Sequence, residues 1–138
     1  MKKRNINKVA VLGSGVMGSR IACHFAEIGL QVLLLDIPPK ELTGAEKKKN
    51  LTLDNTAVKN RIVNEAFLAA VKSNPSPLFT KDVIKNITTG NFEDNMKDIA
   101  SCDWTIEVVV ERLDIKKLIF DEVEKYRKPG TLITSNTS

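Results

Sequence analysis

The sequence predicts an α/β fold in which helices cover both faces of a doubly wound parallel sheet. Two short apolar segments, Lys8–Leu12 and Gln31–Asp36, flank a stretch with helical periodicity. Neither segment alternates between apolar and polar residues, so both are expected to be buried strands of a parallel sheet. A glycine-rich turn joins the first strand to the helix. The two strands and the helix between them are therefore expected to form a β-α-β unit.

The helix between these strands is predicted over Val16–Ile28. Its apolar residues Ile21, Phe25 and Ile28 recur at helical spacing, and Gly29 follows as the expected stop. After the second strand, two consecutive prolines at 38–39 end the regular order.

The stretch Glu41–Asn86 is long for a plain connection, so we expect residues 41–86 to form a helical insertion. A helix is predicted over Ala57–Ser73, a break over Asn74–Pro77 and a helical turn over Lys81–Asn86. Residues 51–56 belong either to the helix or to an earlier one. The apolar side of the helix is expected to hold Val58, Ile62, Ala66 and either Ala69 or Ala70.

The second half of the chain continues the alternation of strands and helices. We predict a strand at Ile87–Thr89 with a turn at Gly90, a short helix or turn at Phe92–Ala100, a strand at Trp104–Val110, a helix at Leu113–Tyr126 and a last strand at Thr131–Ser135. The complete order is β-α-β, inserted helices, then β-α-β-α-β, which is a doubly wound sheet.

Composition excludes several classes of protein. With 138 residues the chain suits one domain, and no apolar run approaches the roughly 20 residues that cross a bilayer. The basic N-terminus precedes an apolar run that glycines interrupt, so we predict no signal peptide and a cytoplasmic protein. The net charge of +4 comes largely from lysines such as 47–49, which we expect to be solvated; attraction of an anionic ligand that carries phosphates is the alternative. Aromatic residues make up only 5%, which argues against nucleic acid as a partner.

The two cysteines and the single histidine do not form a convincing metal site. Cys23 and Cys102 lie far apart and lack a C-x-x-C pattern. We expect both thiols to be buried and reduced, and we expect no metal. His24 lies on the first helix, where a packing or surface role is expected.

Residues 13–18 fit the motif G-x-G-x-x-G, which is strong here because it follows a strand and opens a helix. Gly13 permits the tight turn, Gly15 lets a pyrophosphate approach the backbone, and Gly18 lets the helix lie close to the strand. The helix start at Val16 and Met17 offers N–H groups and a partial positive charge. The motif predicts a dinucleotide site; a tight turn without a ligand is the alternative.

The residues at the end of the second strand predict whether the cofactor is NAD or NADP. Asp36 is placed to accept hydrogen bonds from the adenosine ribose hydroxyls, and its carboxylate would repel the extra phosphate of NADP. Ile37 follows it, where no arginine is available to receive that phosphate. We therefore predict NAD. A simple cap at the strand end is the alternative role of Asp36.

Two later stretches identify a family that the sequence resembles. They are Ile106-Glu107-Val108-Val109-Val110-Glu111-Arg112-Leu113-Asp114-Ile115-Lys116-Lys117 and Ser135-Asn136-Thr137-Ser138. With the glycine loop and Asp36, they resemble the 3-hydroxyacyl-CoA dehydrogenase family over nearly the whole chain. The segments 36–42 and 59–65 look closest to its large bacterial β-oxidation proteins.

The resemblance implies roles for four further residues. Glu111 and Lys116 would contact the nicotinamide half of NAD, Asn136 would lie beside the nicotinamide ribose, and Ser138 would touch both cofactor and acyl-CoA substrate. The alternatives are a helix cap for Glu111, a solvated residue for Lys116, a turn residue for Asn136 and a bare terminus for Ser138.

The resemblance also implies that part of the insertion, within Leu51–Ser73, holds coenzyme A. Three basic residues there could be phosphate partners, although we expect them to be solvated charges: Lys59, Arg61 and Lys72.

The implied activity is oxidation of L-3-hydroxyacyl-CoA to 3-ketoacyl-CoA by hydride transfer to NAD in fatty-acid β-oxidation. The family's catalytic histidine and its glutamate follow the Ser-Asn-Thr-Ser motif, so we expect no catalytic residue within residues 1–138. We interpret residues 1–138 as the NAD-binding domain, cut before a C-terminal catalytic and dimerisation domain. The full-length protein is then expected to be a dimer, and the fragment an inactive monomer.

Two other interpretations remain open. A hydroxyisobutyrate-type 3-hydroxy-acid dehydrogenase has a similar glycine loop, although the long insertion and Ser135–Ser138 argue against it. A non-catalytic module that senses NAD is the other, and a protein that ends at Ser138 would favour it.

Overall fold

The computed structural model describes residues 6–73, 81–108, 113–126 and 132–135. Their five strands form one parallel sheet in the order β3-β2-β1-β4-β5. The predicted doubly wound fold is therefore confirmed. The strands are β1 (Lys8–Leu12), β2 (Gln31–Asp36), β3 (Ile87–Asn91), β4 (Trp104–Glu107) and β5 (Leu132–Ser135).

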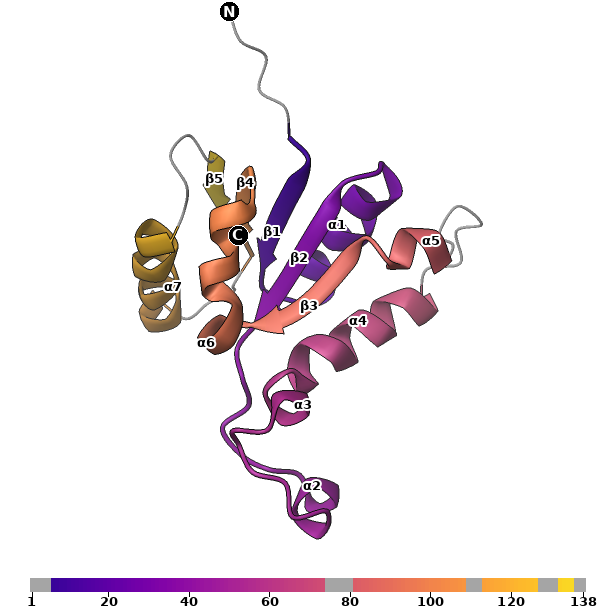
Figure 1. The fold of residues 1–138 in the computed structure, drawn as a ribbon, viewed down its shortest axis with the longest axis vertical. Coiled ribbons are helices and arrows are strands. Elements are labelled where there is room, and N and C mark those ends of the chain that lie inside the picture. Colours follow the sequence, from indigo (N-terminus) through magenta and orange to yellow (C-terminus); the bar gives the residue numbers. More distant parts are fainter. Residues whose placement is uncertain (1–5, 74–80, 109–112, 127–131, 136–138) are drawn as a thin grey trace, which may run out of the picture.

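Helices lie on both faces of the sheet (Figure 1). One face carries α1 (Val16–Glu27), α4 (Arg61–Ser73) and α5 (Lys81–Ile84). The other carries α6 (Phe92–Asn95), the 3₁₀ helix η1 (Met96–Ser101) and α7 (Leu113–Tyr126). Two further helices, α2 (Gly44–Lys48) and α3 (Thr56–Lys59), lie between β2 and α4, and α2 projects away from the sheet (Figure 1).

Successive residues of the central strands pack on opposite faces, as the period of a strand requires. On β1, Val9 and Val11 pack with α1 and α4, whereas Ala10 and Leu12 pack with η1 and α7. All four side chains are fully buried. This arrangement explains why the strands are apolar throughout.

The apolar row predicted for α1 is confirmed in part, because Ile21 and Phe25 are half-buried and pack against the core. The fully buried residues beside them are small, and they include Ala22, Cys23 and Ala26. Ile28 is 61% exposed because the helix ends at Glu27. Small side chains let the helix axis lie close to the sheet, which the spacing of large apolar residues does not reveal.

The predicted helix Ala57–Ser73 is wrong as a single element, because Asn60 separates α3 from α4. Its side-chain oxygen accepts a hydrogen bond of 2.7 Å from the side-chain amide of Asn91. The predicted apolar row is confirmed for Val58, which is fully buried, and for Ala70, which packs against the core. Ile62 is not in that cluster, where Val63 and Phe67 pack instead. Tertiary contacts therefore decide both the break and the buried face.

An earlier helix, α2, exists but begins at Gly44, outside the predicted segment 51–56. The hydroxyl of Thr43 accepts a hydrogen bond from the amide of Glu46, whose carboxylate accepts one from the amide of Thr43. This capping box is visible in the sequence as T-G-A-E, and it is the signal that would have located the helix.

The predicted turn at Gly90 is wrong, because β3 continues to Asn91 and Gly90 pairs with Leu35. A Cβ atom at Gly90 would lie 2.5 Å from the side-chain oxygen of Asn95, so the glycine serves close packing rather than a turn. The predicted break Asn74–Pro77 lies outside the described residues, as do positions 109–110 and 131.

Candidate functional site

The turn between β1 and α1 has the geometry that its glycines predict. Gly13 has a φ of 117°, which L residues with a side chain rarely adopt. Its amide donates a hydrogen bond of 2.7 Å to the carbonyl oxygen of Leu35 at the end of β2. The turn is thereby attached to the edge of the sheet where the parallel strands end, which is where ligands bind in such folds.

The other two glycines have different roles at the start of α1. Gly18 lets the helix lie close to the turn, and Gly15 leaves the space beside the helix start free of side-chain atoms. A Cβ atom at Gly18 would lie 1.8 Å from the carbonyl oxygen of Gly13, so only glycine fits. At Gly15 nothing lies within 4 Å of the corresponding position. No side chain caps the helix start at Gly15, and the following Val16 and Met17 are 75% and 53% exposed. The helix start can therefore receive an anion.

Asp36 lies at the end of β2 and is bound to the glycine turn. Its Oδ2 atom accepts a hydrogen bond of 2.8 Å from the amide of Ser14 and another from the hydroxyl of Ser14. The amide of Ile37 donates to Oδ1 over 2.7 Å. Sequence reasoning missed Ser14, because its partner is defined only once β1 and β2 lie side by side.

A cavity of about 400 Å³ opens beside this turn, between the start of α1 and α4. Three alanines of α4 form its apolar wall, and Arg20 is the charged residue among those that line it. Its lining comprises Ser14, Gly15, Val16, Ser19, Arg20, Ala66, Ala69 and Ala70. The insertion therefore contributes a surface directly next to the glycine turn.

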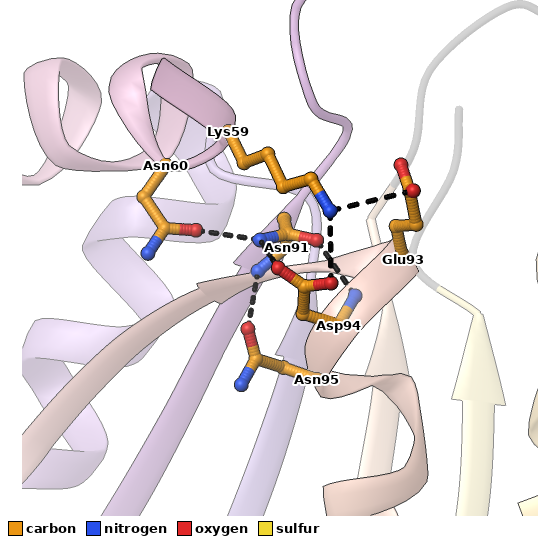
Figure 2. Close-up of polar contacts among 6 residues, drawn as sticks. All are labelled: Lys59, Asn60, Asn91, Glu93, Asp94 and Asn95. Carbon is orange, nitrogen blue, oxygen red and sulfur yellow. Dashed lines mark hydrogen bonds and ion pairs between the residues drawn. The ribbon is translucent and has the colours of Figure 1, made fainter. Parts of the chain in front are cut away.

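Polar contacts join the insertion to the end of β3 (Figure 2). Asn91 is fully buried, and its side-chain amide donates to Asn60 over 2.7 Å. The side-chain oxygen of Asn95 accepts from the amide of Asn91 over 3.0 Å, and the side-chain oxygen of Asn91 accepts from the amide of Asp94 over 2.8 Å. Asn91 lies opposite Asp36 in the sheet. The network therefore joins the residue between α3 and α4 to the end of β3, the strand that pairs with β2 at Asp36.

Lys59 and Arg61 are not free solvated charges. Lys59 lies 3.0 Å from Asp94 and 3.4 Å from Glu93 (Figure 2). The hydrogen bond from Lys59 holds the pKa of Asp94 below its ordinary value, and the same bond raises the pKa of Lys59. Arg61 forms an ion pair with Glu46 and also donates to a backbone carbonyl at position 41. Lys72 is exposed.

Of the remaining predicted site residues, Lys116 is the one that the structure describes. Glu111, Asn136 and Ser138 lie outside the described residues. Lys116 belongs to the first turns of α7. Ser135, the residue before Asn136, ends β5 at the same edge as Glu107 on β4. His24 is exposed on α1.

Three observations concern metal binding, membrane insertion and the cysteines. In the part of the chain that the structure describes, no group of three or more histidine, cysteine or acidic residues could hold a metal ion. Within the same residues no helix is both long enough and apolar enough to span a bilayer. Cys23 and Cys102 are buried and unbridged, as predicted.

The sheet order, the glycine turn and the acid that ends β2 define a Rossmann-type dinucleotide-binding domain. Within that class, the chain belongs to the family described as "3-hydroxyacyl-CoA dehydrogenase, NAD binding domain", which matches residues 8–138. The resemblance stated from the motifs is confirmed, and so is the prediction of NAD as cofactor.

Comparisons with individual proteins agree with the family. A "Probable 3-hydroxyacyl-CoA dehydrogenase" of Bacillus subtilis is 50% identical over 98% of this chain, and the match covers 17% of that protein. The "Peroxisomal bifunctional enzyme" of Cavia porcellus is 33% identical over 98% of this chain, and the match covers 16% of that protein. The crystal structure of 3-hydroxybutyryl-CoA dehydrogenase from Escherichia coli is 28% identical with a TM-score of 0.62, covering 97% of this chain and 25% of that chain. The chain thus spans only a fraction of these relatives' length.

Proposed function

We propose that this chain is the NAD-binding part of an enzyme that oxidises L-3-hydroxyacyl-CoA to 3-ketoacyl-CoA in fatty-acid β-oxidation. Family membership and the names of the relatives support this activity. The observation that supports the proposal best is the hydrogen bond between Asp36 and the glycine turn, because a carboxylate able to accept ribose hydroxyls then lies beside an uncapped helix start able to bind an anion.

In this proposal the pyrophosphate of NAD lies on the open helix start, against the backbone of Gly13, Gly15 and Gly18 and the amides of Val16 and Met17. Asp36, with Ile37 beside it, receives the adenosine ribose and disfavours the additional phosphate of NADP. Glu111, Lys116 and Asn136 hold the nicotinamide half, and Ser138 contacts both cofactor and substrate; these four assignments rest on the resemblance.

We propose that acyl-CoA occupies the cavity between α1 and α4. The apolar wall of Ala66, Ala69 and Ala70 suits an uncharged chain, and Arg20 offers a charge for an anionic group. Lys59 and Arg61 are poor phosphate partners because each is already paired with a carboxylate. The insertion 41–86 would therefore hold the substrate through apolar contacts with its alanines rather than through the charges of Lys59 and Arg61.

NAD, when bound, would supply the hydride acceptor for the oxidation at C3 of the substrate. The residues of this chain bind and orient the two ligands, and a histidine with its glutamate elsewhere in the full protein removes the hydroxyl proton. In this view residues 1–138 form the NAD-binding domain of a dimeric cytoplasmic enzyme, with the dimer contacts outside this domain. The buried, unbridged cysteines support a reducing compartment.

The test compares the full-length protein with residues 1–138. Calorimetry should show NAD binding to both, whereas reduction of acetoacetyl-CoA by NADH should be measurable only for the full-length protein. Activity of the full-length protein on 3-hydroxyisobutyrate rather than on the acyl-CoA would overturn the substrate assignment. Comparable turnover by residues 1–138 would show that the proton acceptor lies within them.

A further inference from the structure

The proposed cofactor site needs more positive charge than the glycine turn supplies. Residues 13–18 contain no lysine and no arginine, so the turn offers only its backbone amides to an anion. The partial charge at a helix start is equivalent to about half an elementary charge. A diphosphate carries more negative charge than that. A cation beside the start of α1 would therefore add to the binding of NAD.

Arg20 lies where it can supply this charge. It follows Val16, the first residue of α1, by four positions, which is about one helical turn or roughly 6 Å along the helix axis. Side chains on a helix lean toward its N-terminus, so the side chain of Arg20 is expected to lean back toward the helix start. Arg20, Val16 and Gly15 all line the cavity between α1 and α4.

The charge of Arg20 is not neutralised by neighbouring side chains. Among the residues that the structure describes, the ion pairs involve Lys59 and Arg61, and the exposed Arg20 belongs to none of them. The wall of the cavity opposite Arg20 consists of alanines, which offer no counter-charge. An anionic ligand is therefore the partner that suits this side chain.

We propose that Arg20 is a cofactor-binding residue, whose guanidinium neutralises the diphosphate of NAD at the start of α1. This inference rests on the proposed placement of the diphosphate against Gly15 and Val16. In that placement the diphosphate is the anion nearest to Arg20, because these three residues line the same cavity. A guanidinium is planar and can donate to two phosphate oxygens at once. Arg20 thus complements the amides of the helix start, and the alanine wall stays free for the acyl-CoA.

The experiment measures dissociation constants by calorimetry for the full-length protein and its Arg20→Met variant. Methionine keeps an apolar stem and a high helix propensity, so the change removes the charge and the donors and leaves α1 intact. NAD and ADP should each bind about 3- to 10-fold more weakly, an effect between that of an exposed ion pair and that of a charge-assisted hydrogen bond. Adenosine, which lacks the diphosphate, should bind both proteins equally. The difference for NAD should shrink as the salt concentration rises.

Two further variants serve as controls. Arg20→Lys keeps the cation but lacks the planar fork, so its affinity for NAD should lie between those of the wild type and Arg20→Met. Lys48→Met removes the same charge from an exposed position on α2, which projects away from the sheet (Figure 1). It should bind NAD, ADP and adenosine as the wild type does.

Three results would overturn the inference. Equal weakening of NAD and adenosine by Arg20→Met would show that Arg20 shapes the site without binding the diphosphate. An equal loss in Lys48→Met would show a general effect of net charge. Unchanged NAD binding by Arg20→Met would also refute it, and weaker binding of coenzyme A in that case would assign Arg20 to the substrate. If the wild type itself binds no NAD, the proposed cofactor site fails; if the wild type and Arg20→Met bind NAD equally, this inference alone fails.

Discussion

The carbonyl oxygen of Gly13 occupies the space where a side chain at Gly18 would begin, with 1.8 Å between that oxygen and the ideal Cβ position. The two outer glycines of the motif therefore depend on each other. Gly13 turns the chain through a positive φ, and Gly18 leaves room for the carbonyl that this turn directs at the helix.

Gly18→Ala should destabilise the domain and weaken NAD binding, because backbone atoms of the turn must move to admit the methyl group. We expect a loss of about 3 kcal/mol, the upper end of the range for overpacking, measured by urea unfolding. Gly44→Ala is the matched control, since nothing lies within 4 Å of its Cβ position on α2. A stable Gly18→Ala protein that binds NAD normally would contradict the contact.

Asp36→Ala should weaken NAD binding by about 10- to 150-fold, because hydrogen bonds to a charged acceptor contribute about 1.5–3 kcal/mol. It should also reduce the preference for NAD over NADP, since a negative charge is removed. Calorimetry with both cofactors measures the two effects. Asp54→Ala, in the exposed part of the insertion, should change neither dissociation constant.

Asn91→Ala should lower the free energy of unfolding by about 1–3 kcal/mol, because it removes a fully buried side chain and leaves the half-buried Asn60 side chain without its hydrogen bond. The loss is measured by urea unfolding with the m-value compared between proteins. Asn7→Ala, at an exposed position, serves as control. An unchanged midpoint for Asn91→Ala would show that the network in Figure 2 adds nothing to stability.

The ion pair of Lys59 with Asp94 should make stability depend on pH at both extremes. The pKa of Asp94 is lowered on folding, so its contribution is full above its ordinary value of 3.8 and is lost as the pH falls below it. The pKa of Lys59 is raised, so its contribution is full below 10.5 and is lost at higher pH.

Lys59→Met should therefore be less stable than the wild type at neutral pH, and the two should converge in strong acid and in strong base. Thermal unfolding across the pH range measures the difference. Lys47→Met removes an exposed lysine on α2 and should follow the wild-type profile throughout. A constant difference between Lys59→Met and the wild type at all pH values would exclude the ion pair as its cause.

Both thiols should react slowly with Ellman's reagent in the folded protein and rapidly in urea. Cys23 and Cys102 are buried, and burial, together with the charge of Glu27, raises the pKa of the Cys23 thiol. A high pKa leaves little of the reactive thiolate at neutral pH. Rapid modification of two thiols in the native protein would contradict the burial of these residues.

Several structural features followed from local patterns. The ends of β1 and β2, the glycine turn and the stop at Gly29 were predicted because each depends on a few neighbouring residues and their backbone preferences. The break at Asn60 was not predicted, since it depends on Asn91, which is 31 positions away. The capping box at Thr43 was available in the sequence and was overlooked.

The sequence by itself determined the class of fold and the family, and its glycine motif predicted a dinucleotide-binding site. These features can be recognised without a structure because periodicity and glycine spacing are properties of short segments. Only the tertiary structure decided which side chains meet. Ser14 and Asp36 are 22 positions apart and become partners because β1 and β2 lie side by side. Hydrogen-bond acceptors are shared between segments that the sheet order brings together, so their occupancy can be counted only after the chain has folded.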